Sequence, residues 1–151
     1  MTRWLTPAEA RAWRGYRRMR GLLDLRLARD LARDSGLSEP DYDVLSTLGE
    51  TEGNRMRLTE LAAHMLWQNS RLSHHIARME QRGLVTRQPC PDDGRGSLVC
   101  LAPAGRAAIG AAAPKHVGSV REHFIDLLTD DELATLAELT ERVVARLRAD
   151  P

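Results

Sequence analysis

The stretch Leu58–Leu101 decides the fold: LTELAAHMLWQNSRLSHHIARMEQRGLVTRQPCPDDGRGSLVCL. Its first half predicts two short helices, over 58–65 with Thr59 as the N-cap and over 69–82, separated by a turn at 66–68. The second helix carries one apolar stripe at spacings of four and three residues, formed by Leu72, Ile76 and Met79. A stripe this narrow is typical of a helix with one buried face and one exposed polar face.

A β-hairpin follows the second helix. The segments 84–88 and 97–101 have the composition of strands, and the loop 89–96 between them is rich in Pro, Gly and Asp. Two helices, a tight turn and a hairpin in this order predict a winged helix-turn-helix. With the helix that Ser38 is expected to cap, this region covers 37–102, in a chain that is otherwise mainly α.

The remaining segments predict long helices on either side of this region. Thr6–Glu9 is a capping box with Pro at the first helical position, and Thr129 begins a second capping box. Pro114 is expected to kink the helix after the hairpin. The first helix has more than one apolar face, which an interlocked dimer covers more easily than a small monomer. We therefore expect 1–36 and 103–151 to form a helical dimerisation layer.

Composition and charge agree with a helical protein that has a basic sector. Hydrophobic residues make up 42% of the chain, with only one Phe, two Tyr and three Trp, which disfavours a β-sandwich. The net charge is only +1, but residues 55–100 hold seven Arg and four acidic residues, whereas 37–54 hold five acidic residues and no Arg or Lys. The first of these sectors is a candidate electrostatic footprint, although solvated faces of mixed charge are an open alternative.

The exposed face of the helix at 69–82 predicts contacts with duplex DNA, because no acidic residue lies between Asn69 and Met79 to repel phosphate. Amide side chains suit adenine, and Arg suits guanine or phosphate. Arg95 at the hairpin tip could enter a minor groove, with Asp93 holding the loop in shape. The predicted contact residues are Gln68, Asn69, Ser70, Arg71, Ser73, His74, His75, Arg78, Asp93 and Arg95. An ordinary amphipathic surface helix and a solvated turn are the alternatives.

Several short motifs in this order resemble the MarR family of bacterial transcription regulators. They are Leu61-Ala62, Ser70-Arg71-Leu72-Ser73, Met79-Glu80-x-Arg82-Gly83-Leu84-Val85-x-Arg87, Asp93-Gly94-Arg95-Gly96 and Leu101-x-x-x-Gly105. The resemblance implies a homodimer whose two winged heads bind a pseudo-palindromic operator, most often as a repressor. It also implies that Asp93 and Arg95 are the wing motif. Ala102 and Trp67 depart from the family pattern, at the start of the helix after the wing and beside the turn.

Many members of the family bind small aromatic molecules, and four residues are candidates for such an effector site: Trp13, Tyr16, Arg17 and Tyr42. Arg17 would favour an anionic effector, whereas the rings could equally fill the core and the interface. A dimeric ligand- or protein-binding module that no longer binds DNA is an alternative function. Thiol redox sensing through Cys90 or Cys100 is a variant of the regulator hypothesis.

Catalysis, cofactors and metals are not expected. The chain has no phosphate-binding Gly loop, HExxH motif or nucleophile elbow. Cys90 and Cys100 form no CxxC, and the five His residues do not form a ligand set. There is no apolar signal region and no stretch long enough to span a bilayer, so we expect a cytoplasmic protein without a membrane partner.

Overall fold

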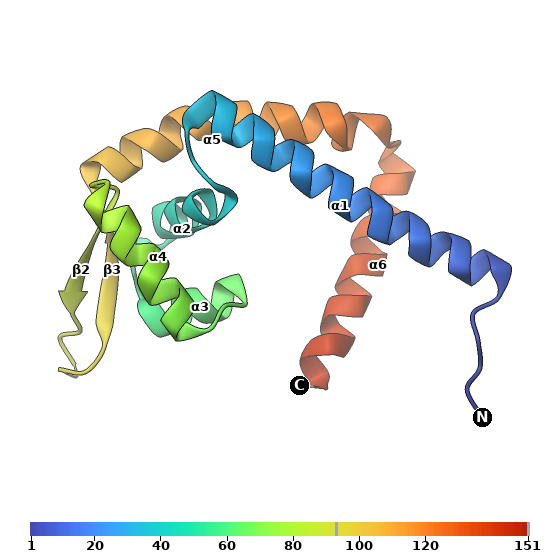
Figure 1. Cartoon of the computed structure of the whole chain (residues 1–151), viewed down its shortest axis with the longest axis horizontal. Coiled ribbons are helices and arrows are strands. Elements are labelled where there is room, and N and C mark those ends of the chain that lie inside the picture. The colour runs from blue at the N-terminus through green and yellow to red at the C-terminus, as the bar shows by residue number, and fades with distance from the viewer. Residues whose placement is uncertain (93, 151) are drawn as a thin grey trace. The chain divides into compact units, whose positions relative to one another are not determined.

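The computed structural model describes residues 1–92 and 94–150, and it is mainly helical with one small sheet (Figure 1). The helices are α1 (Pro7–Ser35), α2 (Glu39–Glu50), α3 (Leu58–Met65), α4 (Asn69–Gln81), α5 (Pro103–His123) and α6 (Asp130–Ala149). Two 3-10 turns, η1 (Glu52–Asn54) and η2 (Ile125–Leu127), connect them. The chain forms two compact units, the end unit (Met1–Leu27 with the chain from Val117 onward) and the central unit (Ala28–His116).

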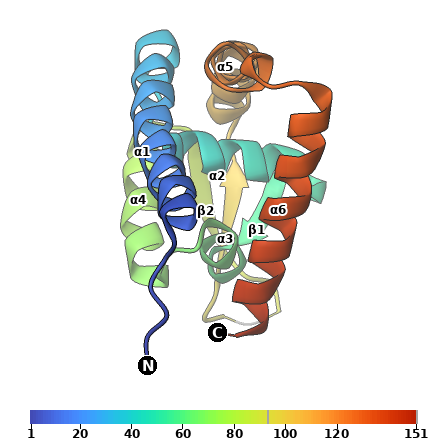
Figure 2. The same cartoon turned by 90° about the vertical axis from the view of Figure 1, so that its right-hand side faces the viewer.

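The sheet of the central unit has three antiparallel strands in the order β1-β3-β2 (Figure 2). β2 (Val85–Pro89) and β3 (Ser97–Leu101) form the predicted hairpin, in which Val85 pairs with Leu101 and Pro89 with Ser97. β1 (Arg55–Arg57) was not predicted, because three residues are too few to show an alternating pattern. The winged helix-turn-helix prediction is confirmed, and the third strand completes it.

The core of the central unit comes from the apolar faces of α2, α3 and α4 and from the sheet. The predicted stripe of α4 is fully buried in it, together with Leu45 and Leu61. Leu31 near the end of α1 and Ala112 in α5 also belong to this core. The compact unit is therefore wider than 37–102, since the helices on either side contribute apolar residues to it.

The end unit has no such core, because none of its described hydrophobic residues is buried. Many of its large apolar residues are at least 41% exposed, among them Trp13, Tyr16, Met19, Leu22, Leu25, Val117, Leu127, Leu139, Val143, Val144 and Leu147. A single chain thus leaves the apolar faces of α1 and α6 open to solvent. Among the described residues, no helix is long and apolar enough to cross a membrane.

The predicted caps are mostly present. Thr6 and Glu9 form the capping box of α1, and Thr129 with Glu132 forms that of α6. Thr59 is not a cap, because β1 runs directly into α3 and the N-cap is Arg57, without a side-chain bond. The helix after the hairpin, α5, ends at His123, and η2 follows it.

Gly105 explains one motif of the sequence. A Cβ at this position would overlap the backbone carbonyl of Leu84, and that oxygen is held because it accepts a hydrogen bond from Ala102 N–H at 3.1 Å. The first turn of α5 therefore contacts the strand end through backbone atoms, which only glycine permits. The same Ala102 N–H contact fixes the start of α5 without a side-chain cap.

We expect Gly105→Ala to lower the free energy of unfolding by about 1–3 kcal/mol through overpacking. Gly110→Ala in the same helix is the matched control, because nothing lies within 4 Å of a Cβ there. The control should be neutral or slightly stabilising, since Ala is the better helix former. Urea denaturation of both variants measures the difference, and equal midpoints would contradict this account of the α5–β2 contact.

Candidate nucleic-acid interface

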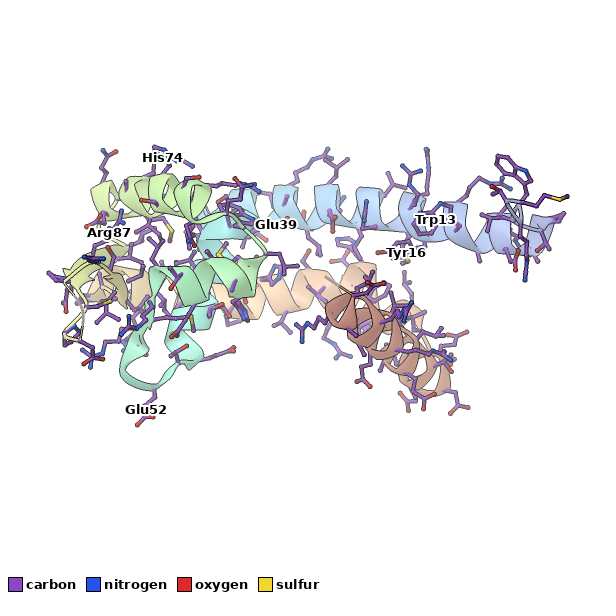
Figure 3. All side chains as sticks on the ribbon, turned by 90° about the horizontal axis from the view of Figure 1, so that it is seen from below. Trp13, Tyr16, Glu39, Glu52, His74 and Arg87 are labelled. Carbon is purple, nitrogen blue, oxygen red and sulfur yellow. The ribbon has the colours of Figure 1, made fainter. Side chains whose placement is uncertain are left out.

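α4 presents most of the predicted contact residues to solvent. Asn69, Ser70, Arg71, His74 and Arg78 are exposed, Ser73 is half-buried, and Gln68 is exposed at the N-cap position. Figure 3 shows His74 directed away from the body of the unit. The exposed face has no acidic residue until Glu80, near the end of the helix. This surface is suited to a negatively charged partner, because donors and cations lie together on it.

His75 is the exception, and its predicted place on the exposed face is wrong. Its side chain is buried, and Nε2 lies 3.0 Å from Oδ1 of Asp41 in α2. On a helix His75 is only about 40° from Met79, so it borders the buried stripe. Arg82 also turns back to Asp41, with Nη1 donating to Oδ2 at 2.7 Å. α4 is thus tied to α2 by polar contacts as well as by its apolar stripe.

The carboxylate of Asp41 is stabilised in its charged form. Burial alone would raise the pKa of Asp41, but the close contact with His75 and the hydrogen bonds from the backbone N–H of Ser38 and from Arg82 outweigh burial and hold this pKa well below its usual range. Asp41 is also the N3 residue of the α2 capping box, in which Ser38 N–H donates to Oδ2 at 3.0 Å. One buried carboxylate therefore fixes the start of α2 and the position of α4.

Trp67 lies in the turn before α4 and organises one of the predicted contact residues. The guanidinium of Arg71 stacks over the Trp67 ring at 3.6 Å, and the ring meets His75 edge-on with centroids 5.7 Å apart. Leu66 ends α3 in the left-handed conformation with φ of 58°. The bulky residue beside the turn is therefore packed against α4, and Asn69 is the first helical residue.

A cleft of about 310 Å³ separates the N-terminal half of α4 from the wing. Three arginines line it from three segments, Arg57 at the end of β1, Arg87 in β2 and Arg95 in the loop, while Asn69, Ser70 and Ser73 line the α4 side. No acidic side chain is among the residues described as its lining. Such a cleft suits a phosphate group, because guanidinium and hydroxyl donors converge on it.

Two of these arginines were not predicted as contact residues. Arg87 donates from Nη1 to Ser73 Oγ at 3.2 Å, so the wing is held against α4, and Figure 3 shows its side chain on this part of the molecule. Arg57 lies 3.5 Å from Asp92. Arg87 stands in the quoted motif and could have been named, whereas Arg57 required the unpredicted β1. Asp93 lies outside the described residues, so its predicted role in holding the loop in shape is not tested.

The two thiols do not support a disulfide switch within one chain. Cys90 lines the cleft but is only 4% exposed, which is typical of a structural thiol. Cys100 pairs with Thr86, whereas Cys90 N–H bonds to the carbonyl of Gly96, which precedes β3 and is four positions before Cys100. That separation is about 13 Å along the strand, too far for a bond between them. Among the described residues, no group of three His, Cys, Asp or Glu could hold a metal.

The predicted effector residues fall in both compact units. Trp13 and Tyr16 stack on α1 with centroids 5.8 Å apart (Figure 3). Arg17 is exposed on the same helix. Tyr42 belongs to the central unit, where it packs on His116 with centroids 4.4 Å apart. The effector site remains a prediction.

Comparisons with known proteins agree with this geometry. The sequence profile of the MarR family matches residues 37–97. AbsC, a MarR family transcriptional regulator from Streptomyces coelicolor, is 42% identical with a TM-score of 0.94 over 99% of this chain and 100% of that chain. Sco3205, a MarR family transcriptional regulator from the same organism solved in complex with DNA, is 38% identical with a TM-score of 0.94. The match covers 100% of this chain and 93% of Sco3205. The transcriptional regulator HosA of Escherichia coli is 29% identical over 133 residues, 87% of this chain and 95% of HosA.

Proposed function

This chain belongs to the MarR family of DNA-binding transcriptional regulators, and we propose that it acts as a homodimeric repressor released from its operator by a small-molecule effector. Proteins of this family regulate transcription and are not enzymes, so catalysis is not part of its function. The operator is proposed to be a pseudo-palindrome, with one half-site for each winged head. A cytoplasmic location follows from this role and stays a prediction.

The observation that carries DNA binding is the continuous donor surface formed by the exposed face of α4 and the arginine-lined cleft beside it. We propose that the exposed α4 side chains contact base edges and that the arginine-lined cleft binds backbone phosphate. A module that had lost DNA binding would have little reason to keep Arg71 and Arg78 on the acid-free face of α4 with Arg95 in the cleft beside it. The DNA complex of Sco3205 supports the same conclusion.

The open apolar surface of the end unit supports the homodimer. Residues such as Leu139 and Val143 are about half exposed in the single chain, and no described hydrophobic residue of the unit is buried. A folded monomer rarely leaves so many large apolar side chains uncovered. A second copy would cover the same surface on both partners, as a two-fold interface requires. The segments 1–36 and 103–151 are therefore proposed as the dimerisation layer.

The effector is proposed to be a small aromatic or anionic molecule. The stacked pair Trp13 and Tyr16, with the exposed Arg17 nearby in sequence, offers ring and guanidinium contacts. Tyr42 and His116 offer a second aromatic surface. Burial lowers the pKa of His116, which favours the neutral form of its ring. A panel of aromatic carboxylic acids, titrated against the protein–DNA complex, tests whether any of them releases DNA.

The wing provides the direct test of DNA binding. Genomic binding-site mapping with the purified protein supplies an operator, and its affinity for wild type and Arg95→Ala is then measured over a salt series. We expect Arg95→Ala to weaken binding by about 1–3 kcal/mol and to lower the salt slope by about 1. Arg142→Ala on α6 removes the same charge elsewhere, and once sedimentation equilibrium shows that this variant is still a dimer, it should leave both quantities unchanged. Equal affinity and slope for wild type and Arg95→Ala would contradict the proposed role of the wing.

A further inference from the structure

His75 stands at the centre of a polar group that joins the inside of the central unit to the exposed face of α4. Its Nε2 lies 3.0 Å from Oδ1 of Asp41, and its Nδ1 lies 3.2 Å from Nη2 of Arg78. The edge of the Trp67 ring closes a third side. His75 is 7% exposed, whereas Arg78 is exposed. The imidazole therefore links a buried carboxylate to a guanidinium at the surface.

The chemistry of these partners selects one form of the ring. A guanidinium has donors only, so the contact with Arg78 requires Nδ1 of His75 to be the unprotonated acceptor. The proton of the neutral ring then lies on Nε2, which faces the Asp41 carboxylate. Nε2 and Oδ1 are 3.0 Å apart but do not form a hydrogen bond by geometry, and neither buried atom has a hydrogen-bond partner among the described residues.

The contact with Nδ1 of His75 restrains Arg78, whose side chain also borders a hollow of the central unit. A hollow of about 620 Å³ lies beside the group, and Arg78, Arg82 and His75 contribute to its lining. A guanidinium on a long, flexible side chain loses rotamer freedom when it is held in one direction. Arg78 already borders this hollow, so without the acceptor on His75 its guanidinium is free to turn into it, away from the exposed face of α4.

We propose that His75 is a positioning residue for DNA binding, which holds Arg78 through Nδ1 while Asp41 holds His75 through Nε2. This inference rests on the proposed function, because it assumes that the exposed face of α4 contacts DNA. Arg78 is thereby presented in one orientation before DNA arrives, so that less freedom is lost on binding. His75 itself touches no DNA and acts through Arg78.

Two amide substitutions separate the two ends of the ring. Asn places its amide at about the distance of Nδ1 from Cβ, and Gln at about that of Nε2, so His75→Asn can keep an acceptor for Arg78 whereas His75→Gln cannot. We expect His75→Gln to weaken operator binding by roughly 5- to 10-fold, which is less than the loss expected for Arg78→Ala. His75→Asn should retain most of the affinity. Urea midpoints of both variants show whether each is folded.

A double-mutant cycle with Arg78→Ala distinguishes positioning from a merely structural role. If His75 acts through Arg78, His75→Gln has no further effect on binding in the Arg78→Ala background. An equal loss in both backgrounds, or equal affinities of the Asn and Gln variants, would overturn the inference. Failure of the wild-type protein to bind any mapped site would instead overturn the proposed function.

A measurement on the wild-type protein tests the ring form directly and needs only a folded His75→Asn variant for assignment. In a ¹⁵N-histidine sample at neutral pH, the protonated ring nitrogen of His75 should be the one coupled to both ring C–H protons, which identifies Nε2. The signal is assigned by its absence in His75→Asn. A proton on Nδ1 would exclude the Arg78 contact and overturn the inference.

Discussion

Asp41→Ala should lower the free energy of unfolding by about 3 kcal/mol, because a buried carboxylate with several donors leaves them without an acceptor. The loss has three parts. Ser38 N–H loses its partner in the α2 capping box, which contributes about 1 kcal/mol. Nε2 of His75 stays buried but loses the Asp41 carboxylate that it faces at 3.0 Å. Arg82 adds little, because its side chain is 43% exposed and its ion pair is screened by solvent.

The stabilisation by Asp41 should also depend on pH in a defined direction. The pKa of Asp41 in the folded protein lies below the unfolded value, which is about 3.9. Its contribution is therefore fully present above that value and is lost as pH falls towards the folded pKa. Urea denaturation of wild type and Asp41→Ala should give a constant difference from neutral pH to about pH 5, and the difference should shrink below about pH 4.

Asp43→Ala is the matched control for this experiment, since it removes the same group from the same helix two residues away. Burial raises the pKa of Asp43, with weaker opposing effects of His116 and His64, so its charged form contributes no such stabilisation. We expect a change of at most about 0.5 kcal/mol. If both substitutions lower the stability equally, the polar link between α2 and α4 does not have the role assigned to it.

His75 shows where prediction from sequence stopped. The stripe Leu72, Ile76 and Met79 was identified correctly from spacing alone, and all three side chains are fully buried. His75 borders that stripe, and its polarity suggested the exposed face. Its burial depends on Asp41, which is 34 positions earlier in the chain. Spacing within one helix carries no information about a partner on another helix, so the contact could not be foreseen.

The wing shows a second limit of the same kind. The hairpin was predicted because β2 and β3 are joined by a loop with clear turn residues. β1 has only three residues, and it becomes a strand because Met56 pairs with Val99 on β3. The place of Arg57 in the cleft was therefore not predicted, whereas Arg95 was predicted as a contact residue because it lies in the loop of the hairpin. The turn residues in the sequence were enough to predict the hairpin, whereas β1 is a strand only because it pairs with β3.

Substituting the open face of α6 should have the largest effect on DNA binding. Leu139 and Val143 are four residues apart, so they lie on one face of the helix, and they are 45% and 56% exposed in the single chain. We expect Leu139→Glu with Val143→Glu to prevent dimerisation, since four carboxylates would meet at a two-fold interface without a partner charge. Sedimentation equilibrium should then give the mass of one chain.

Operator binding should fall with the dimer. Two linked heads bind a two-site operator more tightly than one head does, so separating them is expected to reduce affinity by about 10²–10⁴-fold. A footprint of wild type should cover two half-sites with centres about 10 bp apart. Because the central unit has its own core, circular dichroism of the variant should still show folded winged heads.

The control for this variant adds the same charge on the opposite face of α6. Ala134 and Ala145 are exposed and lie about 140–160° around the helix from the centre of the apolar face. Ala134→Glu with Ala145→Glu should remain dimeric and should bind the operator as wild type does. If this control also dissociates, added charge rather than the loss of an apolar contact is responsible. If the variant with Leu139→Glu and Val143→Glu remains a tight dimer, the interface lies elsewhere on the end unit, and the open face of α6 needs a different partner.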